Sequence, residues 1–229
     1  MFLDLTERLE RLHSSRLVLR PVCLSDAWPL FQATRAPVFN QHLAWDQPSG
    51  LDAVIERVNA IMTASRQGRI TAMSAVLKST GAWVSLFRFL PWERDPKAVE
   101  VGIWTHVDYW HGRYSLELGR MCVDAAFVET PVDRVVGLSL PENRGSCQLM
   151  EAVGMLPTGE GARVAENGRR LQVVEYQLSR SRWMQRVGSG VSYDSVDCDD
   201  DALADLEKGY RVVDAEPCDT MLQEASVNL

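Results

Sequence analysis

The sequence predicts an α/β domain in which helices flank a β-sheet, and two patterns carry that prediction. The first is a change of hydrophobic period in residues 99–129, where Val99, Val101 and Ile103 alternate as in a strand and the apolar residues after Ser115 recur at helical spacing. The second is the recurrence of short β-branched and aromatic runs between amphipathic segments. The predicted strands are residues 16–22, 70–77, 83–90, 99–106, 134–140, 155–160 and 171–178. The predicted helices are residues 3–12, 25–33, 49–62, 115–129 and 143–153.

Residues with restricted or permissive backbones mark the ends of these elements. Pro37 prevents the second helix from continuing, and Pro141 ends the strand at 134–140. Asn143 is a candidate cap for the helix that follows, and Gly154 stands where a helix C-terminus favours a left-handed residue. The turn at residues 78–81 joins its two flanking strands into an antiparallel hairpin.

Length and composition favour one domain with an appendage. A chain of 229 residues accommodates a domain of about 150–200 residues with a sizeable core. It has no run of about 18 apolar residues, and residues 1–15 are too charged for a signal peptide, so we expect a cytoplasmic protein without a membrane segment. Five cysteines are scattered without a CxxC pair, which is typical of reduced thiols.

The net charge of −7 is concentrated at the C-terminal end. Residues 187–229 hold eleven acidic residues and only Lys208 and Arg211 as bases. This composition predicts an acidic, disordered tail after a folded domain at residues 1–186. Because the near-neutral body has no dense Lys/Arg cluster with interleaved aromatic residues, nucleic acid is not expected as a partner.

The loop between the strand at 99–106 and the following helix has the layout of a phosphate-binding turn. Residues 109–114 deliver the chain to a helix N-terminus, with Ser115 as the predicted N-cap. Free backbone N–H groups and the helix dipole favour an anion at such a position. His111 and Arg113 add positive charge there, although an ordinary strand-to-helix turn with exposed cations has the same appearance.

These residues carry a family resemblance. Residues 100–118 are similar to the pattern E-I-G-Y-W-L-x-P-x-Y-W-G-K-G-Y-A-T-E-A of the GNAT N-acetyltransferases, in particular the branch that acetylates the N-terminal alanine or serine of ribosomal proteins. The matching residues are Glu100, Gly102, Trp104, Tyr109, Trp110, Tyr114 and Glu117. The family's R-L-x-L-R-P resembles residues 16–21, and its N-x-x-S resembles Asn143 to Ser146.

The chain also departs from the family's pattern. His111 and Arg113 replace glycines, Gly112 replaces lysine and Ser115 replaces alanine. Glycine in such a loop allows positive φ and a close approach to a pyrophosphate. These departures, with the acidic tail, leave open an alternative from another class: a catalytically inactive GNAT-like module that binds a protein partner or an acyl-CoA.

The resemblance implies a mixed, mostly antiparallel, twisted sheet of six to seven strands, with acetyl-CoA entering where strands 99–106 and 134–140 splay apart. It implies transfer of an acetyl group to a primary amine, on a protein N-terminus or a small molecule, by a monomer or homodimer. The residues then expected to bind the cofactor are Trp104, Thr105, His106, Trp110, His111, Gly112, Arg113, Tyr114, Ser115 and Asn143.

Two residues are expected to act in catalysis. Glu100 would deprotonate the acceptor ammonium, directly or through water, although it is equally well explained as an exposed strand glutamate. Glu166 is a rival base, although a glutamate in a loop is more often merely solvated. Ser146 would return a proton to the departing thiolate, because Met150 occupies the position where many GNAT enzymes have a tyrosine. Ser146 and Asn143 have a second explanation as residues that satisfy their own helix N-terminus. The four histidines are too scattered to predict a metal site.

Overall fold

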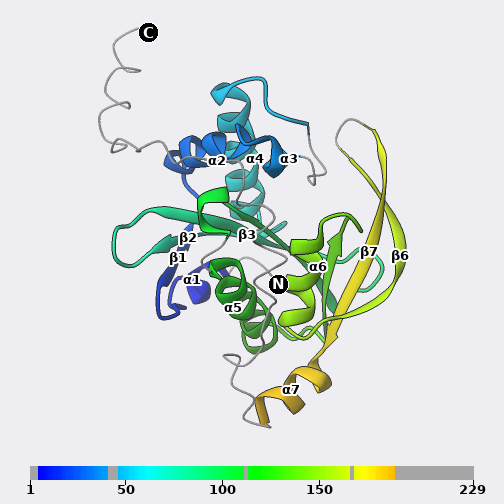
Figure 1. Ribbon diagram of the computed structural model, residues 1–229. Coiled ribbons are helices and arrows are strands. Elements are labelled where there is room, and N and C mark those ends of the chain that lie inside the picture. Colours follow the sequence, from blue (N-terminus) through cyan, green and yellow to red (C-terminus); the bar gives the residue numbers. More distant parts are fainter. Residues whose placement is uncertain (1–4, 41–45, 111–112, 166–167, 189–229) are drawn as a thin grey trace, which may run out of the picture. The chain divides into compact units, whose positions relative to one another are not determined.

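The computed structural model describes residues 5–40, 46–110, 113–165 and 168–188 (Figure 1). Seven strands form one sheet in the order β1-β2-β3-β4-β5-β7-β6. The strands are β1 (Leu17–Pro21), β2 (Thr71–Leu77), β3 (Trp83–Pro91), β4 (Ala98–Thr105), β5 (Arg134–Ser139), β6 (Leu156–Val164) and β7 (Arg170–Ser179). Only β4 and β5 pair in parallel, and every other neighbouring pair is antiparallel. The predicted mixed, mostly antiparallel sheet is confirmed.

The parallel pair separates soon after it begins. Register partners join β4 and β5 only from Ala98, opposite Arg134, to Glu100, opposite Val136. Both strands then continue without pairing with each other, β4 to Thr105 and β5 to Ser139, while each stays paired to its other neighbour. The sheet therefore opens between its fourth and fifth strands, as the splayed arrangement predicted.

Helices cover both faces of the sheet. One core joins α1 (Leu5–Leu9), α5 (Tyr114–Glu129) and α6 (Arg144–Ala152) to one face. A second core joins α2 (Ala27–Thr34), α3 (Pro37–Asn40) and α4 (Leu51–Arg66) to β2 and β3. Two short 3-10 helices, η1 (Leu24–Asp26) and η2 (Val107–Tyr109), and a last helix α7 (Arg180–Gly188) complete the described elements.

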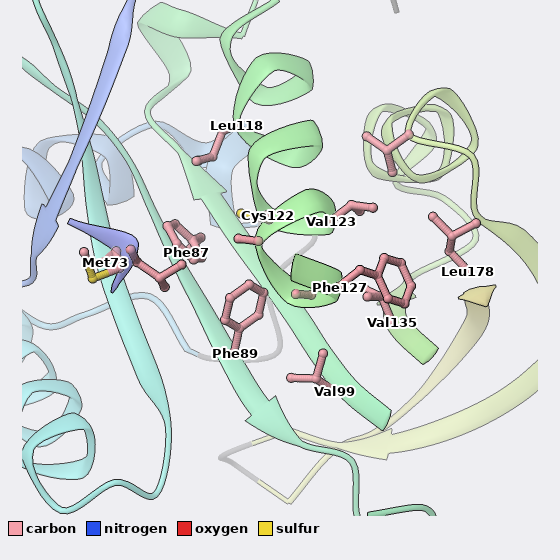
Figure 2. Close-up of a cluster of buried hydrophobic side chains, with 14 of the residues drawn as sticks. Met73, Phe87, Phe89, Val99, Leu118, Cys122, Val123, Phe127, Val135 and Leu178 are labelled. Carbon is pink, nitrogen blue, oxygen red and sulfur yellow. The ribbon is translucent and has the colours of Figure 1, made fainter. Parts of the chain in front are cut away.

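The larger core lies under α5 (Figure 2). Leu118 and Cys122 of this helix lie on the side of Phe87 and Phe89 of β3, and Phe127 lies beside Val135 of β5; all of them are buried. Leu118 and Cys122 are about one helical turn apart and therefore share a side of α5, as the spacing in the sequence predicted. This packing fixes where the N-terminus of α5 meets the end of β4.

A buried carboxylate ties the start of α2 to the sheet. Asp26, which is 1% exposed, accepts hydrogen bonds from the Arg20 guanidinium at 2.5 and 3.0 Å. It also accepts from the Ser74 hydroxyl at 2.7 Å and from the Cys23 backbone N–H at 2.9 Å. Because these groups come from β1, β2 and the intervening loop, Asp26 fixes the second helical layer to the first strands.

Several boundaries differ from the sequence-based prediction. The N-cap of α5 is Arg113 and not Ser115, which lies in the first helical turn. Pro37 not only limits α2 but begins α3, because proline fits the first turn of a helix. The first predicted helix, residues 3–12, is helical only over Leu5–Leu9 among the described residues, and β6 extends to Val164 rather than Glu160.

The C-terminal end of the described chain contains a helix that the sequence did not predict. In α7, the Trp183 indole donates to Asp124 of α5 at 2.7 Å and its ring packs on Phe127. Val187 and Gly188 end this helix, and the remainder of the predicted acidic tail, 189–229, lies outside the described residues. None of the helices in the described ranges combines the length and apolar character that a membrane crossing needs.

Candidate active site

A cavity of about 310 Å³ occupies the opening between β4 and β5. Its walls come from these two strands, from α5 and α6, and from β6 and β7, with Arg57 of α4 and Arg88 of β3 at one side. Four of the predicted site residues line it: Glu100, Trp104, Asn143 and Ser146. The splayed strands therefore bring together side chains that are up to 46 positions apart in the sequence.

The two faces of β4 give the cavity two chemically different ends. Val99, Val101 and Ile103 pack in the core under α5, whereas Trp104 packs with the second core beside α4. Successive strand residues point to opposite faces, so Glu100 and Gly102 share the α4 side with Trp104. One end is apolar, beside Gly119, Leu149, Met150 and Val153 of the α5 side, and the other end is charged.

Glu100 is buried and forms an ion pair across the cavity. Its side chain is 11% exposed, and Arg163 Nη1 of β6 donates to its Oε1. A carboxylate with this little water contact needs such a partner, since an isolated buried charge is costly. The alternative explanation of Glu100 as an exposed strand residue is wrong.

Arg88 and Trp104 form a stacked pair on the same face. The Arg88 guanidinium lies 4.7 Å from the centre of the Trp104 ring. Arg88 is opposite Gly102 in the β3–β4 register, and a Cβ at position 102 would lie 3.5 Å from Arg88 Nε. A side chain at position 102 would therefore make an ordinary van der Waals contact with Arg88.

The first turn of α6 forms the opposite wall. Asn143 is the N-cap of this helix, and its Oδ1 accepts from the Ser146 backbone N–H at 3.1 Å. The cap holds Ser146 at the edge of the cavity, one turn before Met150. Met150 in turn packs beside Gly137 of β5, where an added Cβ would lie 2.7 Å from the Met150 sulfur. The capping role proposed for Asn143 is present.

The other predicted cofactor-binding residues lie at the end of β4 and the start of α5. Ser115 Oγ donates to Thr105 Oγ1 at 2.9 Å, and the Trp110 indole donates to the Thr105 carbonyl at 2.8 Å. These bonds fasten the turn to the strand end. Arg113 has φ 57°, a left-handed conformation, although it is not glycine. His111 and Gly112 lie outside the described residues, as does Glu166.

His106 helps to shape this turn from the inside. Its ring lies edge-on to Trp83 and Tyr109, and its Nδ1 accepts from the Asp108 backbone N–H at 3.3 Å. Burial lowers the pKa of His106, and the nearby Asp108 carboxylate opposes that shift. The imidazole is therefore kept neutral at physiological pH and adds no positive charge to the turn.

A further network anchors the N-terminus of α5 to β1. Glu117 Oε2 accepts from Arg16 Nη2 at 2.6 Å and Nε at 2.7 Å, and Oε1 accepts from the Arg16 backbone N–H at 3.0 Å. The Arg16 guanidinium also lies 4.0 Å above the Tyr114 ring. Burial alone would raise the pKa of Glu117, but its hydrogen bonds, including those from Arg16, and the Arg16 charge outweigh burial and lower it.

Three charged residues of the cavity, Arg57, Arg88 and Arg163, were not predicted from the sequence. A signal for Arg88 was present, because it is the one charged residue within the apolar run at 83–90. For Arg57 and Arg163 the sequence offered no comparable signal. Their position depends on how α4 and the β6–β7 hairpin pack beside β4.

Comparison with known proteins supports the fold and the family. The model of the acetyltransferase (GNAT) domain matches residues 16–156, more than half of the chain. Among solved structures, a GNAT-family acetyltransferase from Bacillus anthracis is 17% identical, with a TM-score of 0.64, over 74% of this chain and 98% of that one. A putative ribosomal-protein-serine acetyltransferase from Vibrio cholerae is 17% identical, with a TM-score of 0.66, over 73% and 95%. RimJ of Mycobacterium smegmatis, solved with CoA-disulfide, is 18% identical, with a TM-score of 0.61, over 76% and 89%. The chain belongs to the GNAT family of acetyltransferases.

Proposed function

We propose that the protein transfers an acetyl group from acetyl-CoA to a primary amine by direct attack of the amine on the thioester. The observation that carries this proposal is the cavity where β4 and β5 separate from each other, which has Glu100 on one wall and Ser146 on the other. The acceptor is either a protein N-terminus or a small molecule. The similarity to the Vibrio and Mycobacterium proteins favours an N-terminal acceptor of the ribosomal-protein kind.

The start of α5 fits the phosphates of acetyl-CoA. This helix is 16 residues long, and its first turn directly follows the turn fastened to Thr105. Backbone N–H groups at a helix N-terminus bind phosphate, and Arg113 adds a positive charge beside them. The left-handed φ of Arg113 gives the backbone at this position the conformation that glycine adopts most easily, so the loss of the family's glycine does not by itself argue against cofactor binding. The CoA compound bound by Mycobacterium RimJ in the same fold supports this role.

The thioester would then lie at the opening of the sheet. The amine nitrogen forms a bond to the acetyl carbon, the carbon–sulfur bond breaks, and the thiolate of CoA leaves. Glu100 accepts the proton that the amine loses. Its ion pair with Arg163 positions the carboxylate on the acceptor side of the cavity. Ser146, on the α6 side, donates a hydrogen bond to the departing sulfur and passes its hydroxyl proton to it, and the serine regains a proton from water.

Two substitutions test these roles. Ser146→Ala and Glu100→Gln should each lower kcat by roughly 10- to 1,000-fold and leave the Kd for acetyl-CoA nearly unchanged, as expected for groups that act in proton transfer. Glu100→Gln should also recover rate as pH rises, because more of the acceptor amine is then neutral without help. Initial rates against pH, with peptide N-termini and small amines, measure both effects. Glu142→Gln, an exposed neighbour of the α6 cap, is the matched control.

The outcomes separate this proposal from its alternative. Full activity in both variants would remove Glu100 and Ser146 from the mechanism. If the parent binds acetyl-CoA, seen as a stabilisation of about 2.7 kcal/mol at 100 times its Kd, but acetylates no amine, the chain is an acyl-CoA-binding module instead.

A further inference from the structure

We propose that Arg163 is a further catalytic residue, whose guanidinium binds the carbonyl oxygen of the acetyl thioester and stabilises the negative charge that forms there. This role rests on the proposed function and deepens it, because holding Glu100 in place is then only half of what the ion pair does. Three features support the role: the place of Arg163 at the cavity, the donors that Glu100 leaves unused, and the change in the charge of the pair when Glu100 takes a proton.

Arg163 reaches the cavity because the β6–β7 hairpin continues beyond the end of β5. The last register pair between β5 and β7 joins Ser139 to Val174. Strands β6 and β7 stay paired with each other past this point, and Arg163 lies opposite Leu171 there. Both Arg163 and Leu171 line the cavity. This end of the hairpin therefore places a guanidinium at the opening where β4 and β5 separate from each other.

The ion pair with Glu100 uses only part of the hydrogen-bonding capacity of Arg163. A guanidinium has five N–H donors in one plane. Nη1 of Arg163 donates to Glu100 Oε1, and within the described ranges no other acceptor is bonded to this side chain. The Arg163 side chain is 32% exposed, so its remaining donors are open to a ligand. They are free to bind an oxygen atom of a substrate in the cavity.

Proton transfer to Glu100 changes the net charge of the pair. Before the reaction, the carboxylate and the guanidinium together are neutral. Attack of the amine forms the nitrogen–carbon bond and moves the carbonyl π electrons onto oxygen, and Glu100 then takes a proton from the resulting ammonium. Because Glu100 is now a neutral acid, the Arg163 charge is uncompensated while the carbonyl oxygen is negative. The electrons return to the carbonyl as the carbon–sulfur bond breaks and the thiolate leaves.

Burial makes this change of charge effective. The Glu100 side chain is 11% exposed, and apolar residues such as Leu149 and Val153 line the other end of the cavity. Charges interact more strongly where little water screens them. Glu100 also holds the Arg163 guanidinium in place before the substrate arrives, so this donor needs little reorientation during the reaction. One ion pair thus serves both the proton that leaves the amine and the oxygen that becomes negative.

Rates in a Glu100→Gln background separate this role from the positioning of Glu100. Glutamine resembles the protonated acid, and the double variant Glu100→Gln/Arg163→Gln leaves neither partner of the pair charged, so it avoids an unpaired buried carboxylate. We expect its kcat to be about 10- to 100-fold below that of Glu100→Gln, with a nearly unchanged Kd for acetyl-CoA. Glu100→Gln/Arg163→Lys should keep part of this rate. Arg170→Gln, which removes an exposed arginine of the same hairpin, should leave kcat unchanged in either background.

A spectroscopic measurement tests the contact without turnover. Acetyl-CoA with an isotopic label at the acetyl carbonyl carbon is bound to each protein without an acceptor, and the carbonyl stretch is recorded by infrared difference spectroscopy. A guanidinium at the oxygen polarises the C=O bond, so the stretch should lie at lower wavenumber in the parent than in Arg163→Gln. It should be lowest in Glu100→Gln, where no carboxylate compensates the arginine charge. Arg170→Gln should match the parent.

The outcomes separate the role of Arg163 from the proposed function. Turnover of an amine by the parent, with equal kcat in Glu100→Gln and the double variant and one carbonyl stretch in all proteins, would overturn the role and leave acetyl transfer intact. A shifted stretch that Arg163→Gln abolishes, with no turnover of any amine, would support the contact and overturn the proposed function. A loss of kcat in Arg163→Gln that disappears in the Glu100→Gln background would make Arg163 a positioning residue only and overturn its catalytic role.

Discussion

The Arg16–Glu117 pair should hold the N-terminus of α5 in place, and removing it should weaken both folding and cofactor binding. Glu117→Gln keeps the shape of the side chain but removes the charge that accepts from Arg16 Nη2, Nε and backbone N–H. The Glu117 side chain is 14% exposed and that of Arg16 is 42% exposed, so water screens the pair from one side only. We expect this pair, in which two guanidinium N–H groups donate to Oε2, to contribute about 1–2 kcal/mol, more than a fully exposed ion pair and less than a buried one.

Urea unfolding of the parent, Glu117→Gln, Arg16→Met and the double variant measures this coupling directly. For a domain of this size, a loss of about 1–2 kcal/mol corresponds to a fall in Tm of about 2–8 °C. Since Tyr114 begins α5 and lies under Arg16, the same variants should raise the Kd for acetyl-CoA several-fold. Additive effects at pH 7.5, with a coupling below about 0.3 kcal/mol, would refute the argument.

The coupling should also depend on pH in one direction. The pKa of Glu117 is lowered in the folded protein, so this carboxylate stabilises the fold above its unfolded-state pKa. The contribution is then lost as pH falls through the folded-state pKa, because protonation removes the charge. The coupling measured at pH 7.5 should therefore shrink below about pH 4.5. A coupling that is constant across this range would mean that the carboxylate charge is not its source.

Three further substitutions test other parts of the structure. Burial raises the pKa of Asp124, although its hydrogen bond from Trp183 and the charge of Arg120 oppose that shift, so the ionised carboxylate destabilises the fold as pH rises through the folded-state pKa. Asp124→Asn should therefore have a higher Tm than the parent at pH 7.5 and should lose this advantage below about pH 4. A lower Tm than the parent at pH 7.5 would contradict this explanation. Gly154 has φ 96°, and an added Cβ would lie 2.7 Å from Arg186 Nη1. Gly154→Ala should therefore lower the free energy of unfolding in urea by about 1–2 kcal/mol. Gly159→Ala, where an added Cβ meets no atom within 4 Å, is the control and should leave this free energy unchanged. Arg113→Gly restores the glycine of the family's pattern at a position with left-handed φ and removes the arginine charge. If that charge contacts a phosphate, calorimetry should show weaker acetyl-CoA binding without a fall in Tm. An unchanged Kd would exclude the contact.

Local pattern was enough to predict most of the fold. The seven strands and the two long helices follow from a hydrophobic period of two or 3.6 residues, which depends only on neighbours along the chain. Asn143 and Gly154 also act as expected, because helix capping and positive φ are local requirements. The family motif then predicted which strands separate, and the register of β4 and β5 confirms it.

Local pattern failed where two signals compete or where a distant partner decides. Serine is a residue type that often caps helices, yet the Ser115 hydroxyl donates a hydrogen bond to Thr105 Oγ1, and Arg113 is the N-cap. The helix α7 has few apolar residues of its own and depends on the contact of Trp183 with Asp124 and Phe127. Neither contact can be inferred from sequence spacing.

The sequence by itself determined the family, the strand–turn–helix at the proposed cofactor site and the candidacy of Glu100 and Ser146, because motif residues and hydrophobic period are properties of the chain. Tertiary structure alone decided that Arg163 is the partner of Glu100 and that Arg57 and Arg88 join the same cavity. These arginines come from α4, β3 and β6, and an electrostatic interaction depends on distance in space rather than on separation along the chain. The charge that lines the cavity is therefore set by how the helices and the β6–β7 hairpin pack around the open sheet.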